Sequence, residues 1–132
     1  VLQAMRCGHD GSMTTIHATS PNDLVERAVT IALFGNLGLS ETSLRRMVVD
    51  SLDVLVLLAR FADGQRKIVR ICEPYRDASG EVRFNDLFVF DHTGYDHGRT
   101  QGAFRWVGPT RNAERFKRAG IALPPEILGT LR

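Results

Sequence analysis

The chain has 132 residues, 43% of them hydrophobic and 24% charged, which suits one soluble domain with a buried core. Its formal net charge of +2 is too small to indicate a nucleic-acid or membrane partner. Its longest apolar run, residues 54–59, is far below the roughly 18 residues of a membrane span. The charge is uneven, because residues 99–132 carry seven basic and two acidic side chains and form a basic tail.

Two cysteines, Cys7 and Cys72, lie in different segments without the short spacing of a metal motif, which predicts reduced thiols rather than a disulfide. Residues 1–7 have a helical, apolar pattern but no residue that would cap a helix start. We therefore expect them to be the end of a helix, and the chain to be part of a longer protein.

Two helices are expected in the first half of the chain. Ser20, followed by a proline and by Asp23, is typical of a helix start and predicts a helix over residues 21–34. A second helix is expected over residues 40–52, with an exposed Glu41–Arg45 ion pair. The inward positions expected on the two helices are Leu24, Ala28, Ile31 and Ala32, then Leu44, Met47, Val48 and Ser51.

Several strands are expected around these helices. Residues 12–18 are small or β-branched and predict a short buried strand, whereas the aliphatic residues 53–61 predict a central strand covered on both faces. Residues 67–73 and 81–91 predict two more strands, and the short turns between them favour an antiparallel meander. The fold class expected is therefore α/β, a mixed sheet with this meander at one edge and with flanking helices.

The last third of the chain has weaker patterns. Residues 92–102 hold three glycines and no periodicity, which predicts a loop or linker. The segments expected after it are a short strand over 103–107, a helix over 112–119 with Phe116 inward, and a helical turn over 124–128.

The stretch from Cys7 to Pro21 is the candidate site, because it gathers two histidines, two glycines and several hydroxyl residues. His17 would lie at the carboxyl end of a strand and directly before a helix start, where free N–H groups attract phosphate. Its imidazole could donate a hydrogen bond to a terminal phosphate. The alternative is a buried His17 whose ring is satisfied by a backbone carbonyl.

Residues 8–18, Gly-His-Asp-Gly-Ser-Met-Thr-Thr-Ile-His-Ala, resemble the histidine box of the type II/IV secretion ATPase superfamily. They look most like the CpaF-type motor of Flp (tight-adherence) pili. Cys7 and Thr19 depart from the usual pattern, which has threonine and asparagine at these positions. The resemblance covers nearly the whole chain, through residues 2–5, 20–23, 53–60 and 86–90, Phe104, and residues 119–126.

The resemblance implies the C-terminal portion of a RecA-like P-loop ATPase. Such a motor works as a homohexamer, peripheral to the inner membrane at its cytoplasmic face, where ATP hydrolysis drives pilin export through membrane platform proteins. His9 and His17 match the catalytic histidines of the box, and His17 is expected to sense the γ-phosphate. The other box residues expected near the nucleotide phosphates are Gly8, Gly11, Ser12, Thr14 and Thr15.

Under this resemblance residues 1–91 belong to the RecA-like domain, 92–102 to the linker and 103–132 to the basic tail. The chain contains no Gly-x-x-x-x-Gly-Lys-Ser/Thr loop, and neither of its two lysines follows such a glycine pattern. Mg-ATP binding and hydrolysis need that loop and an acidic residue of the Walker B type. We therefore expect this chain alone to be inactive, to bind no cofactor tightly and to hold no metal.

Two alternatives concern metal and nucleic acid. Cys7, His9 and His17 are zinc-type donors but are one short of the usual four, and the Asp-His pairs at residues 91–92 and 96–97 are ligand-rich in the same way. The two helices mimic a helix-turn-helix whose Arg45 and Arg46 would contact phosphates. The net negative charge of residues 1–98 speaks against nucleic acid as a partner.

A third alternative is an assembly module. Here the basic tail would dock on a neighbouring subunit, a platform protein or anionic lipid. The residues expected to make this contact are Arg111, Arg115, Lys117 and Arg118.

Overall fold

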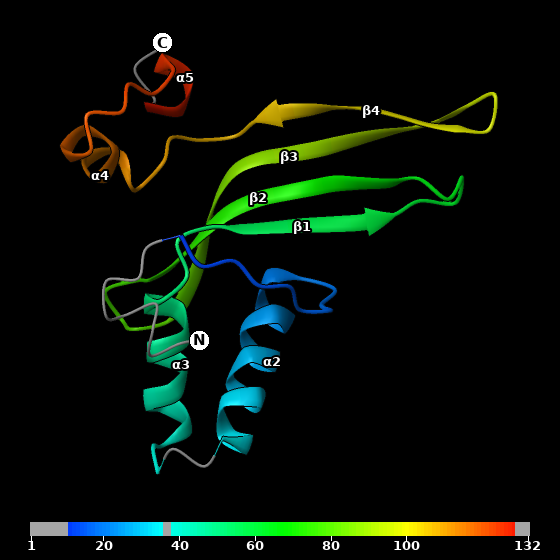
Figure 1. Ribbon diagram of the computed structural model, residues 1–132. Coiled ribbons are helices and arrows are strands. Elements are labelled where there is room, and N and C mark those ends of the chain that lie inside the picture. Colours follow the sequence, from blue (N-terminus) through cyan, green and yellow to red (C-terminus); the bar gives the residue numbers. More distant parts are fainter. Residues whose placement is uncertain (1–10, 36–37, 129–132) are drawn as a thin grey trace. The chain divides into compact units, whose positions relative to one another are not determined.

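The computed structural model describes residues 11–35 and 38–128. The helix expected over residues 1–7, together with Cys7, Gly8 and His9, lies outside the described residues. The fold is mixed α/β, with a four-stranded antiparallel sheet (Figure 1). Its elements are α2 (Pro21–Phe34), α3 (Glu41–Asp50), β1 (Leu55–Arg60), β2 (Arg66–Arg76), β3 (Val82–Asp96), β4 (Arg99–Trp106), α4 (Ala113–Arg118) and α5 (Pro125–Leu128).

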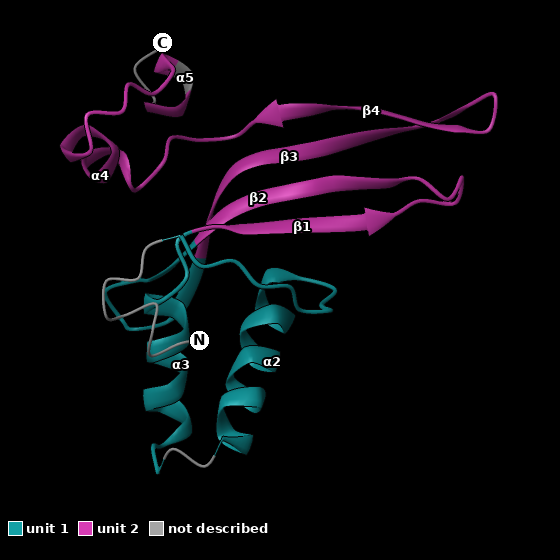
Figure 2. Ribbon diagram, in the orientation of Figure 1, with its two compact units in different colours: residues 1–53, 74–83 teal, residues 54–73, 84–132 magenta. Residues whose placement is uncertain are grey.

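The chain divides into two compact units (Figure 2). Unit 1 comprises Val1–Asp53 and Pro74–Arg83, and therefore contains α2 and α3. Unit 2 comprises Val54–Glu73 and Phe84–Arg132, and holds most of the sheet and both C-terminal helices. Among the described residues, none of the helices has the length and apolar character needed to cross a membrane.

Helix α2 begins and ends where the sequence predicts. Ser20 is its N-cap, and the Ser20 Oγ accepts a hydrogen bond from the Asp23 N–H at 3.1 Å. The buried side, however, is formed by Pro21, Val25, Val29 and Ala32. Ile31, expected to point inward, is 60% exposed. Apolar residues occur on more than one side of this helix, so the partner helix decides which side is buried.

That partner is α3, which packs against α2 within unit 1. Its buried residues are Leu44, Val48 and Val49, in agreement with the inward side expected near Leu44 and Val48. Ser40 caps the helix by accepting a hydrogen bond from the Ser43 N–H at 3.2 Å. The helix ends at Asp50, two residues before the expected end.

Arg45 connects the two helices. Its Nη2 donates to Glu41 Oε1 at 3.0 Å, as the sequence predicts, and also to Glu26 Oε2 on α2 at 2.8 Å. The hydrogen bond to Glu26 is the main cause that raises the pKa of Arg45, and the same bond lowers the pKa of Glu26. Arg45 therefore links α2 to α3, in addition to forming the predicted ion pair along α3.

The sheet is a meander in which each strand pairs with the next one along the chain, in the order β1-β2-β3-β4. Strands β1 and β2 are antiparallel from Leu55↔Cys72 to Arg60↔Arg66, and β3 and β4 are antiparallel from Phe88↔Trp106 to Asp96↔Arg99. The predicted meander is confirmed, and within residues 11–35 and 38–128 it accounts for all four strands of the sheet.

Strand β1 lies at an edge of this sheet, so the prediction of a central strand covered on both faces is wrong. Leu55 is buried, but Val56 is 46% and Leu58 is 62% exposed. An uninterrupted aliphatic run is typical of burial on both faces. It does not show how many neighbours a strand has, which is fixed by pairing elsewhere in the chain.

The strand predicted over residues 12–18 is also wrong, because this segment is irregular and mostly exposed. Its β-branched residues favour extended backbone, but a strand also needs a hydrogen-bonded neighbour. Within the described part of the chain, the sheet consists of β1 to β4 and does not include this segment.

The loop expected over residues 92–102 is instead a β-hairpin. Strand β3 continues to Asp96, and β4 begins at Arg99. His97 and Gly98 form the turn with φ of 44° and 73°, as two-residue hairpin turns require. The other two glycines also belong to the hairpin. Gly94 lies at a register shift between β3 and β4, and Gly102 lies inside β4.

Candidate functional site

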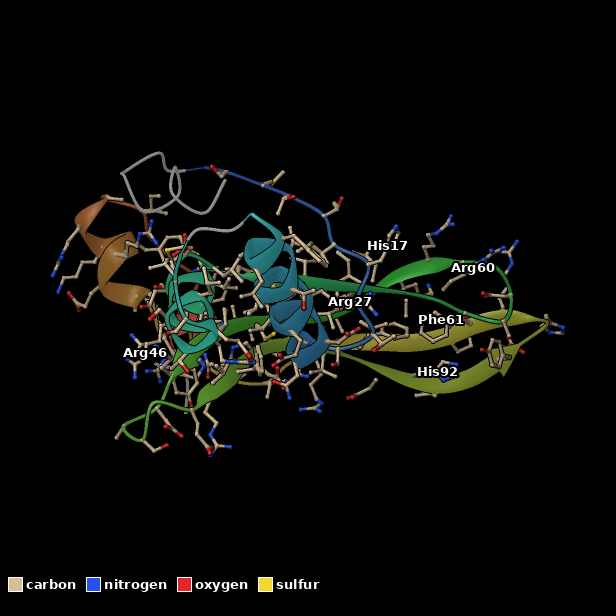
Figure 3. The ribbon with its side chains drawn as sticks, turned by 90° about the horizontal axis from the view of Figure 1, so that it is seen from below. His17, Arg27, Arg46, Arg60, Phe61 and His92 are labelled. Carbon is tan, nitrogen blue, oxygen red and sulfur yellow. The ribbon has the colours of Figure 1, made fainter. Side chains whose placement is uncertain are left out.

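His17 lies in the irregular segment that precedes α2, and its side chain is exposed. It makes no hydrogen bond or ion pair with any described residue. The alternative of a buried, carbonyl-satisfied His17 is therefore wrong. Figure 3 shows His17 together with Arg27 of α2. The ring is available to a ligand.

The described residues of the histidine box form one exposed segment around residues 11–17. Gly11 has φ of 91°, a left-handed conformation that suits glycine in a turn. Ser12, Thr14 and Thr15 are exposed. The structure thus presents their hydroxyl groups at the surface beside His17, without enclosing them in a core.

The start of α2 already carries a negative charge. The Asp23 carboxylate accepts hydrogen bonds from the Thr19 N–H at 2.8 Å, the Thr19 hydroxyl at 3.1 Å and Arg27 Nε at 2.9 Å. The Thr19 N–H is the main cause that lowers the pKa of Asp23. An arriving phosphate would meet this carboxylate, so the helix start is a less open anion site than the sequence suggests.

The residues of the two alternative sites, for metal and for nucleic acid, are placed as follows. In residues 11–35 and 38–128 no three His, Cys, Asp or Glu side chains are arranged to hold a metal ion. Asp96 and His97 form only a pair, with His97 Nε2 3.7 Å from Asp96 Oδ1. Arg45, expected to contact phosphates in a helix-turn-helix, is bound by two glutamates, whereas Arg46 is exposed.

Cys72 is a free thiol in β2 with none of its surface exposed. Burial raises the pKa of this thiol to about 11. It is therefore a core residue and not a reactive or metal-binding cysteine at neutral pH.

The basic tail carries its charges on α4 and on the segment before it. Arg115, Lys117 and Arg118 are exposed on this helix, and basic side chains in a last helical turn complement the helix dipole. Arg111 is exposed too, but its backbone N–H points inward and donates to Glu73 Oε2 at 2.7 Å. The tail is thus fixed to the sheet at its beginning.

Glu73 is the feature that the sequence analysis missed. It is 2% exposed, and its carboxylate accepts hydrogen bonds from the Arg111 N–H, from Asn85 Nδ2 at 3.0 Å, from Asn112 Nδ2 at 2.9 Å and from the Thr110 hydroxyl. Burial alone would raise its pKa, but these donors outweigh burial and lower it. The sequence did contain a signal for this network. Glu73 follows the apolar residues Ile71 and Cys72 near the end of a predicted strand, and a buried carboxylate needs hydrogen-bond partners.

Comparison with known proteins gives a partial likeness. No family model matches the chain. Over 83 residues it is 30% identical to two proteins of Mycobacterium tuberculosis, from strains CDC 1551 / Oshkosh and ATCC 25618 / H37Rv, that are provisionally named conjugal transfer proteins. The match covers 63% of this chain and 23% of each relative, so the chain spans a minor part of the length of these proteins.

Proposed function

We propose that this chain is the C-terminal part of an ATP-driven transfer or secretion motor of the CpaF type, with a RecA-like ATPase domain. The observation that carries the proposal is the histidine-box sequence of residues 8–18, which includes an exposed His17 shortly before α2. The partial likeness to two conjugal transfer proteins supports the broader part of the proposal, a role in transfer between compartments or cells.

In this motor the histidines of this chain sense the γ-phosphate of a nucleotide that other residues bind. His17 donates an N–H to an oxygen of the γ-phosphate, and His9 assists from the same box. A Walker-type lysine and acidic residue elsewhere in the motor bind Mg-ATP and orient the attacking water. Loss of the γ-phosphate removes the partner of His17, so the segment before α2 is free to change position after hydrolysis.

The assembled motor is a homohexameric ring that is peripheral to the membrane and acts on platform proteins. The tail supports a docking role, because Lys117 and Arg118 are exposed on a helix whose start is fixed by the Glu73 hydrogen bonds. Charges that are held in place can steer an acidic partner into one orientation.

The experiment uses the full-length motor with His17→Ala. We expect ATP turnover to fall on the order of a hundredfold, as when one donor to a developing oxyanion is removed. Nucleotide affinity should change by less than about threefold, because the phosphate-holding residues remain. His97→Ala is the matched control, since it removes another exposed histidine, from a hairpin turn of unit 2. Equal losses in turnover and in affinity would contradict the sensor role of His17.

A further inference from the structure

The carboxyl end of α2 carries large apolar side chains that are exposed, and we call this group the helix tip. It consists of Ile31, Leu33 and Phe34 on α2, together with Leu39 shortly before α3. Their exposed fractions are 60%, 43%, 85% and 45% in this order. Figure 1 shows α2 and α3 side by side, with this end of α2 and the start of α3 at the same end of the pair. The helix tip is therefore one end of the helix pair in unit 1.

The last turn of α2 is apolar on every side. Its four residues, from Ile31 to Phe34, follow one another at about 100° around the helix axis. Of these four, Ala32 is the one that is buried. A surface helix normally has one apolar side and a polar side opposite to it, whereas a helix that is apolar all round is surrounded by apolar material. The helix tip thus has more apolar surface than packing against α3 uses.

The charges that flank the helix tip bind each other. Residues 28–40 include no charged side chain. Arg27, just before this stretch, donates to Asp23 at 2.9 Å, and Arg45 of α3 is bound by two glutamates. A protein–protein interface usually has a polar rim around its apolar centre, and arginine is enriched in it. Because these arginines already have partners within unit 1, the helix tip suits an apolar medium better than a charged protein surface.

Polar groups at this end of α2 also have partners within the helix. The Thr30 hydroxyl donates to the Glu26 carbonyl at 2.9 Å, and the Gly35 N–H donates to the Ala32 carbonyl at 3.1 Å. The interior of a bilayer offers no hydrogen-bond partner to an N–H or O–H group. These two donors can therefore approach hydrocarbon without losing a bond.

The size of the helix tip fits a bilayer better than a second copy of the chain. Its exposed apolar area is about 400 Å². A stable interface needs about 800 Å² from each partner, so this surface alone is too small for a dimer. The four residues of the last turn span about 6 Å along the helix axis. An apolar surface that lies in a membrane interface is buried by about 5–10 Å, which matches this length.

We propose that the helix tip inserts into the boundary between the headgroups and acyl chains of a lipid bilayer. The inference rests on the proposed motor for the presence of a membrane beside the protein, and it names the element that touches this membrane. Insertion uses apolar area and is separate from any attraction of the basic tail to lipid phosphate. One helix tip binds weakly and reversibly, whereas the copies in a ring bind together and strengthen the attachment.

The test is co-sedimentation of the 132-residue protein with phosphatidylcholine vesicles, which carry no net charge. We expect Phe34→Ser and Ile31→Ser each to weaken partitioning by about fivefold to fiftyfold, because each removes apolar area that insertion buries. Met13→Ser is the matched control for Phe34, and Leu58→Ser is the matched control for Ile31, since these residues are 95% and 62% exposed outside the helix tip. Circular dichroism verifies that each variant is folded.

High salt separates the helix tip from the basic tail. Binding by insertion should persist at about 1 M salt, at which attraction between exposed charges is screened. Three results would overturn the proposal: no binding to these vesicles, wild-type partitioning in both helix-tip variants, or a lipid-free oligomer that Phe34→Ser dissociates, which would make the helix tip an interface between copies. The assay contains no nucleotide, so its failure would leave the turnover test of His17 in the motor unaffected.

Discussion

Replacing Glu73 by glutamine tests whether one buried carboxylate fixes the C-terminal tail to the sheet. The carboxylate oxygen Oε2 accepts from the Arg111 N–H and Asn85 Nδ2, and Oε1 accepts from Asn112 Nδ2 and the Thr110 hydroxyl. Glutamine replaces one of these oxygens by an NH2 group. Two donors then face a third donor instead of an acceptor.

Asn85 Nδ2 keeps a second acceptor, the Pro109 carbonyl at 2.9 Å, and the Thr110 hydroxyl can rotate. At least one buried donor nevertheless loses its partner, at about 1–3 kcal/mol, and the remaining bonds lose their charge assistance. We expect Glu73→Gln to lower the free energy of unfolding by about 2–4 kcal/mol.

Urea unfolding followed by Trp106 fluorescence measures this loss, because the single tryptophan lies in unit 2 with the whole Glu73 network. Glu114→Gln is the control, since Glu114 is exposed on α4, and should change the stability by less than about 0.5 kcal/mol. A loss below about 0.5 kcal/mol for Glu73→Gln as well would refute the reasoning that the carboxylate is a structural anchor.

The same network predicts a pH dependence. The pKa of Glu73 is lower in the folded state than its ordinary value of 4.5. The contribution of Glu73 is therefore fully present above pH 4.5 and is lost as the pH falls through the lower, folded-state pKa. We expect the stability difference between wild type and Glu73→Gln to be constant near neutral pH and to shrink in acid.

Three further predictions concern other parts of the chain. Gly102→Ala should destabilise unit 2 by about 1–3 kcal/mol in the same unfolding assay, because its Cβ would lie 2.4 Å from the Asp91 carbonyl oxygen. The control Gly108→Ala should be nearly neutral, because the nearest atom to its Cβ would be 3.5 Å away. Equal losses of stability in the two variants would contradict the predicted clash at Gly102. Arg45→Ala should destabilise unit 1 by about 0.5–1 kcal/mol in circular-dichroism melting, and by less at high salt. Arg46→Ala is the control. A loss of stability for Arg45→Ala no larger than that for Arg46→Ala would show that the link to Glu26 is not stabilising. The purified 132-residue chain should show no ATP turnover in a phosphate-release assay, and measurable turnover would contradict the need for a separate phosphate-holding loop.

Local chemistry explains which elements could be predicted from the sequence. The cap at Ser20 and the turn at Gly80 depend on residues close in sequence, so α2 and the β2–β3 hairpin were placed correctly. Pairing between distant residues was not accessible in this way. The edge position of β1 and the rotation of the buried side of α2 towards Val25 and Val29 depend on which neighbour each element meets.

The candidate sites show the same division. The structure shows that His17 is exposed, whereas its role as a phosphate sensor stays a prediction from the histidine-box resemblance. The β3–β4 hairpin was missed because residues 92–102 were interpreted as a loop, although His97-Gly98 is a recognisable two-residue turn. The alternation of Phe88, Phe90 and His92 would then have continued the strand. The Glu73 network joins residues that are 12 to 39 positions apart, beyond the reach of any short motif.

Because Cys72 is buried, chemical modification of its thiol reports how often the sheet opens. Its thiol lies on β2 opposite Leu55 of the edge strand, with no exposed surface and a pKa of about 11. An alkylating reagent therefore reaches the Cys72 thiol only in molecules in which the structure around β2 has opened, as when β1 separates from β2. The rate of modification at Cys72, measured separately from that at Cys7, therefore reports these openings, and they can be timed without any introduced label.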